Sequence, residues 1–194
     1  MNKPFLFLLL LLSLHASAEE LVYEMSVFGF TFGKMVVTKN KIDDSTEVYT
    51  LNAKGKTNFL WMKREDETRY EVRYRNGKLL SSTYIQIESG VIKHWTNITF
   101  DGTKYLVDSY RGKRTFTEIP DYSVLTLYFK QPVKRTQVFY EAESHFIDLK
   151  YKEDNVVEMK ADDGSRTVYY FTNGKLNEIE IHLSIANVHM NRIN

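Results

Sequence analysis

Hydrophobic and polar residues alternate along most of the chain with a period of two. The stretch EDETRYEVRYR shows the pattern best, since Tyr70, Val72 and Tyr74 share one face and charged side chains occupy the other. Such alternation predicts antiparallel strands with one buried and one solvated face. Asn76-Gly77 follows at once. Because both central residues of a type I′ turn need positive φ, an Asn-Gly pair between two β-prone runs predicts a hairpin.

Similar turn signals recur down the sequence and divide it into short β-prone runs. We expect strands near residues 20–28, 31–40, 46–56, 66–75, 78–88, 91–100, 103–110, 113–118, 136–141, 145–152, 155–161, 165–172, 175–183 and 185–190. Short strands joined by tight turns form an antiparallel meander. A sheet of this many strands does not stay flat, so it must curl or fold into two packed layers. The sequence therefore predicts an all-β fold, a curved antiparallel meander closing toward a barrel-like sheet.

One stretch, IPDYSVLTLYFKQP, interrupts the alternation. Proline stands near both ends, Asp121 occupies a position suited to a helix N-cap, and apolar residues at helical spacing follow it. This pattern predicts one short helix near 122–129, which would plug or cover one end of the sheet. A buried strand is the alternative for the same residues.

The first eighteen residues carry a targeting pattern. Lys3 supplies a positive start, FLFLLLLLSL is an apolar run, and ASA places small residues before Glu19. This is the pattern of a signal peptide cleaved after Ala18. The alternative, an uncleaved membrane anchor, needs about 20 apolar residues, whereas this run has about ten. We therefore expect residues 1–18 to be a signal peptide and 19–194 a single β domain, periplasmic or extracellular and not spanning the membrane.

The composition excludes some classes of binding partner and some kinds of catalytic chemistry. Removal of the leader takes away one of the 26 basic residues and leaves all 25 acidic ones, so the net charge is near zero. This balance argues against a nucleic-acid partner, which would favour a basic surplus. Cysteine is absent, which excludes disulfides, thiol catalysis and thiolate metal sites. The core alone must hold the domain, and its many aromatic residues could supply that core.

Two glycines in SVFGFTFGKMVV raise the question of a phosphate-binding loop. Such loops need a helix N-terminus after the glycines, whereas strand formers follow Gly33. The pattern favours a tight turn at Gly29 to Thr31. Gly33 would then lie in the returning strand, as a bulge or a point of close backbone approach.

Residues able to do chemistry are scattered along the chain. No serine lies in a G-x-S-x-G motif. Glu178, Glu180 and His182 share one strand face and could ligate a metal, but a solvated polar stripe explains them as well. We expect no enzyme activity, no cofactor and no metal. A cleft that gathers His94, His145 or His182 with carboxylates would change this expectation.

Aromatic side chains fall in successive strands. Tyrosines that point inward give an interior that is apolar yet able to hydrogen-bond, which suits a lipid or another amphiphile. The alternative is that they fill the core or pair across strands. A separate apolar run, FLWM before KREDE, would be a lid over the barrel mouth or an exposed docking patch. The candidate ligand-binding residues are Tyr70, Tyr74, Tyr84, Trp95, Phe59 and Trp61.

Several segments together resemble a known family. They are the run from Leu21 to Lys34, the hairpin from Tyr74 to Ser82, WTNITFDGTKY at 95–105, SVLTLYFKQP at 123–132 and FTNGKLNEIE at 171–180. In these segments the chain resembles a domain-of-unknown-function family of small exported proteins from Gram-negative bacteria. The resemblance implies an exported, β-rich single domain. The shared residues are glycines, turns and core positions, so it implies no catalytic or binding residue.

Two functional expectations follow. The first is a non-catalytic binding protein of the cell envelope, whose ligand is a lipid or another hydrophobic or amphipathic small molecule. The alternative is a scaffold or accessory protein that binds another envelope protein through an edge strand or the FLWM run. Neither expectation involves a nucleic acid.

Overall fold

The structure, a computed structural model, describes residues 18–59, 62–162, 164–184 and 186–194, with the side chains of 57–64 left out. The expected signal peptide lies outside these residues, except for its last position, Ala18, which begins the first strand. Within the described residues, no helix is long and apolar enough to cross a membrane.

The described chain consists of fourteen strands and one helical turn. The strands are β1 (Ala18–Val27), β2 (Phe30–Lys41), β3 (Thr46–Phe59), β4 (Met62–Arg75), β5 (Lys78–Glu88), β6 (Val91–Phe100), β7 (Tyr105–Ser109), β8 (Gly112–Phe116), β9 (Gln137–Tyr140), β10 (His145–Glu153), β11 (Val156–Lys160), β12 (Arg166–Thr172), β13 (Lys175–His182) and β14 (Asn187–Arg192). The helix is α1 (Val124–Leu127). The predicted all-β class is confirmed, and each predicted strand corresponds to an observed one.

The largest differences from prediction lie at the β3–β4 hairpin and at α1. β3 and β4 run further than expected, so that Phe59 pairs with Met62. The other two residues of the FLWM run, Leu60 and Trp61, lie outside the described residues. The helix is a single turn within the predicted 122–129. Its N-cap is Ser123. Asp121, predicted for that position, instead binds the Arg135 guanidinium through both carboxylate oxygens at 2.9 and 3.0 Å.

All fourteen strands form one antiparallel sheet. Its order is β8-β7-β6-β5-β4-β3-β2-β1-β14-β13-β12-β11-β10-β9, so the first and last strands of the chain are neighbours in its middle. Five residue pairs, from Tyr23 with Arg192 to Val27 with Val188, join β1 to β14. The two edges of the sheet, β8 and β9, come from the centre of the chain. No strand pairing joins these edges within the described residues, so the sheet is curved but not closed into a barrel.

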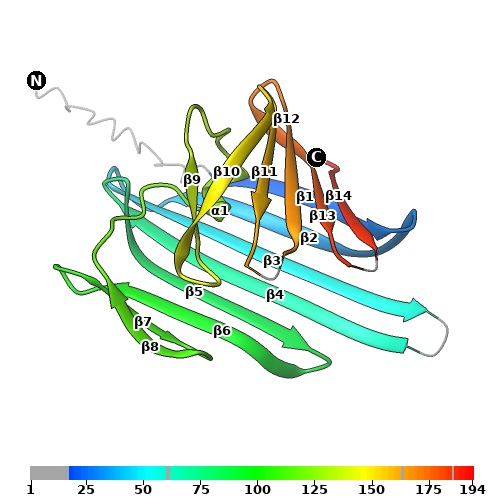
Figure 1. The fold of residues 1–194 in the computed structure, drawn as a ribbon, viewed down its shortest axis with the longest axis horizontal. Coiled ribbons are helices and arrows are strands. Elements are labelled where there is room, and N and C mark those ends of the chain that lie inside the picture. The colour runs from blue at the N-terminus through cyan, green and yellow to red at the C-terminus, as the bar shows by residue number, and fades with distance from the viewer. Residues whose placement is uncertain (1–17, 60–61, 163, 185) are drawn as a thin grey trace, which may run out of the picture.

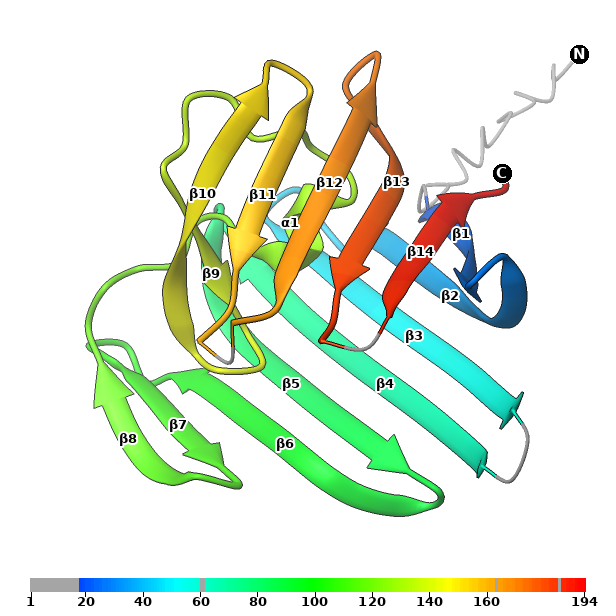
Figure 2. The same ribbon diagram turned by 45° about the vertical axis from the view of Figure 1, so that its right-hand side comes forward.

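The curled sheet forms two facing layers. Figures 1 and 2 show β10–β13 crossing in front of β2–β5, with α1 between the layers. Every residue of α1 is buried. Just after it, the ring of Tyr128 packs edge-on against Tyr23 of β1 at 5.8 Å, and Phe129 packs against Tyr49 of β3 at 5.7 Å. The helical turn therefore fills the space between the layers, which fits the plug expected for this segment.

The segment before α1 also covers one sheet edge. Phe139 of β9 donates its backbone N–H to the Tyr122 carbonyl at 3.0 Å, and Ser123 forms a parallel bridge with Phe139. Pro120 accepts a hydrogen bond from the Leu79 N–H at 3.0 Å. Because an uncovered edge invites pairing with other chains, this contact protects β9. The other edge, β8, is short and mostly exposed.

The geometry of the β1–β2 hairpin shows why glycine stands at positions 29 and 33. The predicted turn at Gly29 to Thr31 is corrected, because the turn residues are Phe28 and Gly29 and β2 already begins at Phe30. Gly29 has a φ of +79°. Gly33 lies opposite Gly55 of β3, where a Cβ would stand only 2.2 Å from the Lys54 carbonyl oxygen and 2.6 Å from Met25 Cε. The register also shifts beside Met25. The predicted close backbone approach at Gly33 is confirmed, and no helix follows it.

The surroundings of Gly33 and Gly29 predict which alanine substitution lowers the free energy of unfolding more. Gly33→Ala forces backbone against backbone, and we expect it to lower the free energy of unfolding by about 2–3 kcal/mol. Gly29→Ala meets open space and carries only the penalty of a left-handed backbone, about 1 kcal/mol. Urea denaturation of both variants measures the two losses. A larger loss for Gly29→Ala than for Gly33→Ala would contradict the close approach.

Candidate functional site

Three of the predicted ligand-binding residues lie on the inner face of the sheet. Tyr70 of β4 pairs with Tyr84 of β5, and their rings are 4.6 Å apart. Tyr74 packs edge-on against Tyr49 at 5.8 Å. Burial raises the pKa of all three hydroxyls above the usual value, so they stay neutral. Sequence reasoning therefore placed Tyr70, Tyr74 and Tyr84 on the correct face.

Most inner tyrosine hydroxyls are already used within the protein. Tyr23 donates to the Leu176 carbonyl at 3.0 Å, and Tyr105 donates to the Leu79 carbonyl at 3.0 Å. Tyr84 donates to Gln86 Oε1 at 3.0 Å. Among the described residues, the buried Tyr74 hydroxyl has no hydrogen-bond partner. The centre of the sheet is thus packed and internally bonded, which favours the filled-core alternative there.

The structure does not place the other predicted ligand-binding residues among the inner tyrosines. Trp95 pairs with Ile85, one position along from the pair of Tyr84 with Thr96. Because successive side chains of a strand point to opposite faces, Trp95 lies on the face away from Tyr84. Phe59 lies in β3 with its side chain outside the described part, and Trp61 lies wholly outside the described residues.

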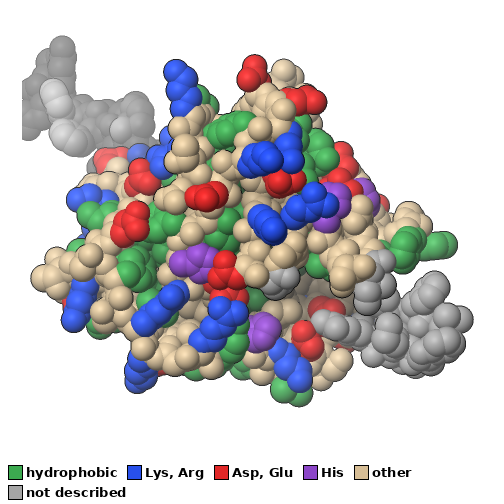
Figure 3. All heavy atoms as spheres, in the orientation of Figure 1, with side chains coloured by type: hydrophobic (Ala, Val, Ile, Leu, Met, Phe, Trp, Pro, Cys, Tyr) green, Lys and Arg blue, Asp and Glu red, His purple; other side chains and the backbone are tan. Residues whose placement is uncertain are grey.

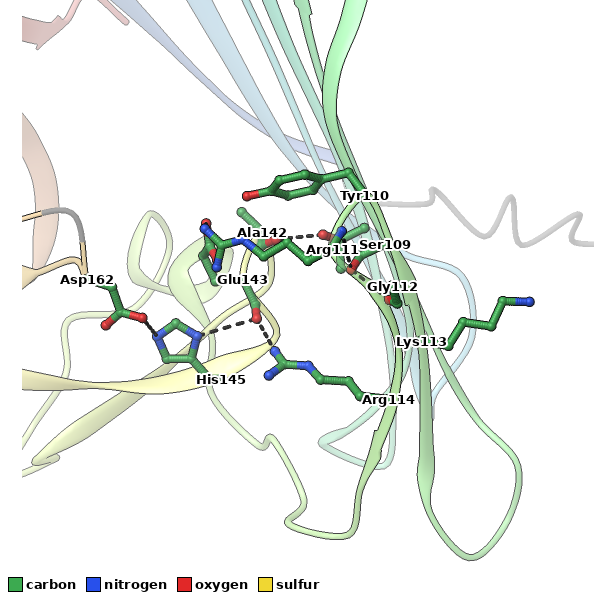
Figure 4. A pocket seen from close by; sticks show the side chains of 11 residues that line it. Ser109, Tyr110, Arg111, Gly112, Lys113, Arg114, Ala142, Glu143, His145 and Asp162 are labelled. Atoms are coloured by element: carbon green, nitrogen blue, oxygen red, sulfur yellow. Dashed lines mark hydrogen bonds and ion pairs between the residues drawn. The ribbon is translucent and has the colours of Figure 1, made fainter.

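The cavity shown in Figure 4 lies at the edge of the packed region. Its volume is about 300 Å³, and it lies between the β7–β8 hairpin, the turn from β9 to β10 and the turn from β11 to β12. Its lining residues are Thr96, Ser109, Tyr110, Arg111, Gly112, Lys113, Arg114, Ala142, Glu143, His145 and Asp162. We call the space between edges β8 and β9 the seam. This cavity occupies one end of it.

Local hydrogen bonds fix both turns that border the seam. Ser109 Oγ accepts the Arg111 N–H at 3.3 Å and donates to the Gly112 carbonyl at 3.0 Å, which holds the β7–β8 turn in shape. Opposite, Thr96 Oγ1 of β6 donates to the Ala142 carbonyl at 2.6 Å. The Glu143 N–H bonds the Tyr140 carbonyl at 3.3 Å. These contacts place the guanidinium of Arg111 against the β9–β10 turn.

Side chains, rather than strand pairing, bridge the seam. Arg111 forms an ion pair with Glu143 through Nη1, and its Nη2 donates to Glu143 Oε1 at 3.1 Å. Arg114 Nη2 donates to the carbonyls of Glu143 and Ser144, the latter at 2.9 Å. Figure 4 shows these arginines reaching toward the β9–β10 turn, while Lys113 points away. The polar end of the seam is thus held by two arginines.

A second cavity adjoins the first. It has a volume of about 370 Å³ and shares Arg114 and His145 with the first cavity. Its apolar walls are Phe116, Phe139 and Phe146. The centre of the Phe139 ring lies 5.5 Å from that of Phe116 and 5.2 Å from that of Phe146. The seam therefore has a charged compartment, in which Arg111 and Arg114 stand beside the carboxylates of Glu143 and Asp162, and an aromatic compartment, with Arg114 and His145 common to both.

An aromatic and polar wall leads from the core to the first cavity. Gln86 Oε1 lies 3.1 Å from His94 Nδ1, and the His94 ring stacks on Tyr110 at 4.4 Å. The Arg111 guanidinium lies over the Tyr110 ring, 5.2 Å from its centre. Since Gln86 also accepts from Tyr84, this wall connects one predicted tyrosine with the cavity.

The first cavity does bring a histidine and carboxylates together. His145 Nε2 lies 3.7 Å from Asp162 Oδ2, and its Nδ1 lies 3.4 Å from the Glu143 carbonyl. A histidine acting as general base must reach the proton that it removes. The Thr96 and Ser109 hydroxyls donate to backbone carbonyls instead of His145. The arrangement offers charge and shape for binding, and no activated hydroxyl nucleophile among these residues.

The polar stripe on β13 is occupied by local contacts. Glu180 accepts from Asn187 Nδ2 at 2.8 Å and from the Tyr170 hydroxyl at 3.2 Å, and His182 Nε2 lies 3.5 Å away from it. His189 of β14 lies 3.6 Å from Glu178. In the described part of the chain, no group of three or more His, Asp or Glu side chains is arranged to hold a metal ion.

Glu141 anchors the turn that carries the site. Its side chain is fully buried, and Oε1 accepts the Leu125 N–H of α1 at 3.3 Å. Among the described residues, Oε2 has no hydrogen-bond partner, and the Ser123 hydroxyl is not placed to donate to it. Burial raises the pKa of the Glu141 carboxyl from 4.5 to about 7, against the opposing effect of the backbone N–H groups of α1. This carboxyl links α1 to the β9–β10 turn, whose Ala142 and Glu143 line the first cavity.

Glu141 makes the stability of the fold depend on pH. Because its folded pKa lies above the unfolded value, the stabilising proton is present at low pH and is lost as pH rises toward 7. Between pH 4 and pH 8 we expect the free energy of unfolding to fall by about 3 kcal/mol relative to Glu141→Gln. Urea titrations at several pH values measure this difference. The exposed control Glu71→Gln should keep the wild-type slope, and an equal slope in Glu141→Gln would refute the assignment.

Sequence reasoning identified part of this site. The sequence points to His145 as a candidate for chemistry, whereas it indicates only a turn between the strands predicted at 103–110 and 113–118. Arg111 and Glu143 were missed because they lie in turns 32 residues apart and meet only through the curling of the sheet. The available signal was a basic hairpin, with Arg111 in the turn and Lys113 and Arg114 at the start of β8, which by itself is typical of a solvated hairpin.

The fold and seam define an all-β protein with one curled fourteen-stranded sheet and a two-part cavity between its edges. Residues 23–193 match the family described as a domain of unknown function, DUF6134, so the chain belongs to that family. The predicted resemblance to a domain-of-unknown-function family is confirmed to this extent. Neither the curated proteins nor the solved structures include a significant match to the chain.

Proposed function

We propose that this protein is an exported, non-catalytic binding protein of the cell envelope, and that its ligand is an amphipathic anion. Such a ligand carries a carboxylate or phosphate head on an apolar chain. The observation that carries the proposal is the two-part seam, in which Arg111 and Arg114 border one cavity and Phe116 and Phe146 line the next.

Size and chemistry both support this class of ligand. Small-molecule sites commonly measure about 300–1,000 Å³, and cavities of about 300 and 370 Å³ fall in that range. Guanidinium groups recognise carboxylate and phosphate oxygens through charged hydrogen bonds. Aromatic rings accept an apolar chain. The ligand expected from the sequence is kept, but its proposed position moves from the tyrosine-lined interior to the seam.

Glu143 determines whether a substitution at this site should weaken or strengthen ligand binding. It now pairs with Arg111, so an anionic head must compete with it. We expect Arg111→Gln to weaken binding of dodecanoate and dodecyl phosphate about tenfold. Glu143→Gln frees the guanidinium and should strengthen binding several-fold. Isothermal titration calorimetry measures both, with Arg73→Gln on the exposed face of β4 as the matched control.

Three outcomes would count against the proposal. One is no measurable binding of either anion by the wild-type protein. Another is equal affinity of Arg111→Gln and the Arg73→Gln control. The third is equal affinity for dodecanol and dodecanoate, because the arginines would then contribute nothing to recognition of the head.

The export part of the proposal rests on the leader sequence. We expect N-terminal sequencing of the protein from its producing cells to begin at Glu19 and fractionation to place it outside the inner membrane. A mature chain that still begins at Met1 in the cytoplasmic fraction would contradict export.

The alternative is a scaffold that binds an envelope protein through an edge strand. β9 is covered by Tyr122 and Ser123, which leaves β8 as the edge for such pairing. β8 has five residues, which limits the ladder that a partner strand could form. The seam therefore supports the ligand-binding function better.

A further inference from the structure

Four hairpin turns of the protein share one backbone geometry but differ in composition. In each, a residue with φ of 49–52° precedes a glycine with φ of 71–82°. The four pairs are Phe28-Gly29, Asn76-Gly77, Ser89-Gly90 and Asn173-Gly174. Short polar residues, asparagine above all, tolerate the left-handed region best, whereas a bulky aromatic residue is strained there. Phe28 is the exception in an otherwise polar series.

The fold provides no contact that offsets this strain. Phe28 is 72 % exposed, and Phe30 on the other side of the turn is also 72 % exposed. A Cβ placed at Gly29 would meet nothing within 4 Å, so the turn projects into open space. Among the described residues, neither ring stacks on another aromatic side chain. The two rings are held outward at a cost in stability.

Other apolar side chains are exposed at the same end of the sheet. Val91 and Ile92 follow the β5–β6 turn, and Leu183 follows β13; each is at least half exposed. The register places these turns at the same end of the sheet as the opening hairpin, since Val27 pairs with Val188 and the β5–β6 turn bonds Glu65 of β4. Figure 3 shows hydrophobic side chains projecting at the right-hand end, where Figure 1 places the β1–β2 turn. We call this set, Phe28, Phe30, Val91, Ile92 and Leu183, the apolar tips.

The shape of the apolar tips fits a bilayer better than a protein groove. The β1–β2 and β5–β6 turns are four strand spacings apart, or roughly 20 Å, so the tips are separate projections rather than one continuous patch. A fluid acyl layer receives separate projections without a matching shape, as it does for the apolar faces of interfacial helices.

Charge at the apolar tips points to the same partner. Lys34 lies on the strand that follows Phe30, and Lys93 follows Ile92; both are exposed. In the described part of the protein, neither lysine forms an ion pair, although Lys34 lies opposite Glu24 in the register. Ammonium groups beside inserted apolar side chains attract anionic phospholipid headgroups.

We propose that the apolar tips dock the protein onto the surface of a phospholipid bilayer, with the Phe28 and Phe30 rings entering the boundary between headgroups and acyl chains. This contact is peripheral and does not depend on the seam. It assigns a role to the strained phenylalanine, because a tip that projects outward can insert where an asparagine could not.

The test replaces Phe28 by the residue that two other turns use. Phe28→Asn should reduce partitioning onto vesicles of phosphatidylcholine and phosphatidylglycerol about tenfold, because a phenyl ring no longer leaves water. The same substitution should raise the thermal midpoint by about 2–4 °C, because the left-handed strain is relieved. Co-sedimentation with vesicles measures the first effect, and thermal unfolding measures the second. All variants carry the same N-terminus, so any contribution of the leader is common to them.

Ile42→Asn is the matched control. Ile42 is 63 % exposed on the β2–β3 turn at the opposite end of the sheet. It should leave vesicle binding unchanged. The proposal is overturned if the wild-type protein does not bind these vesicles, or if Phe28→Asn binds them as well as Ile42→Asn does. It is also overturned if analytical ultracentrifugation shows self-association that Phe28→Asn abolishes while vesicle binding persists, since the tips would then contact a second copy.

Discussion

The pairing of β1 with β14 is the interaction on which the architecture depends. It places the two ends of the chain in the middle of the sheet and joins two meanders that run outward from it. Neither meander encloses a core by itself. Leu21 and Tyr23 of β1 are buried in the same cluster as Phe171 and Ile179 of the other half. The single core therefore requires that residues more than 140 positions apart in sequence meet.

The central segment of the chain, between β8 and β9, completes the core and covers one sheet edge. The segment between β8 and β9 supplies α1 to the space between the layers, and Tyr122 and Ser123 to the edge of β9. Glu141 then connects α1 to the turn that borders the seam. The buried carboxyl and the seam thus belong to one connected structure, because Glu141 directly precedes Ala142 and Glu143, which line the first cavity.

The strands were predictable because their signals are local. Alternation over Tyr70, Val72 and Tyr74 and the turn at Asn76-Gly77 each depend on a few neighbouring residues. Strand order was not predictable, because nothing local indicates that β1 pairs with β14. The seam depends on that order. Arg111 and Glu143 meet only after the sheet has curled. For this reason the sequence pointed to the inner tyrosines of the sheet as the binding site, and not to the turns that border the seam.

The seam also determines how the molecule can deform. Strand pairing connects every neighbouring strand from β8 to β9, and its backbone hydrogen bonds resist stretching along that path. At the seam the circumference is completed by side chains, chiefly those of Arg111 and Arg114. Widening at this place breaks no strand ladder. We therefore expect the girth of the protein to change more easily at the seam than across any strand ladder.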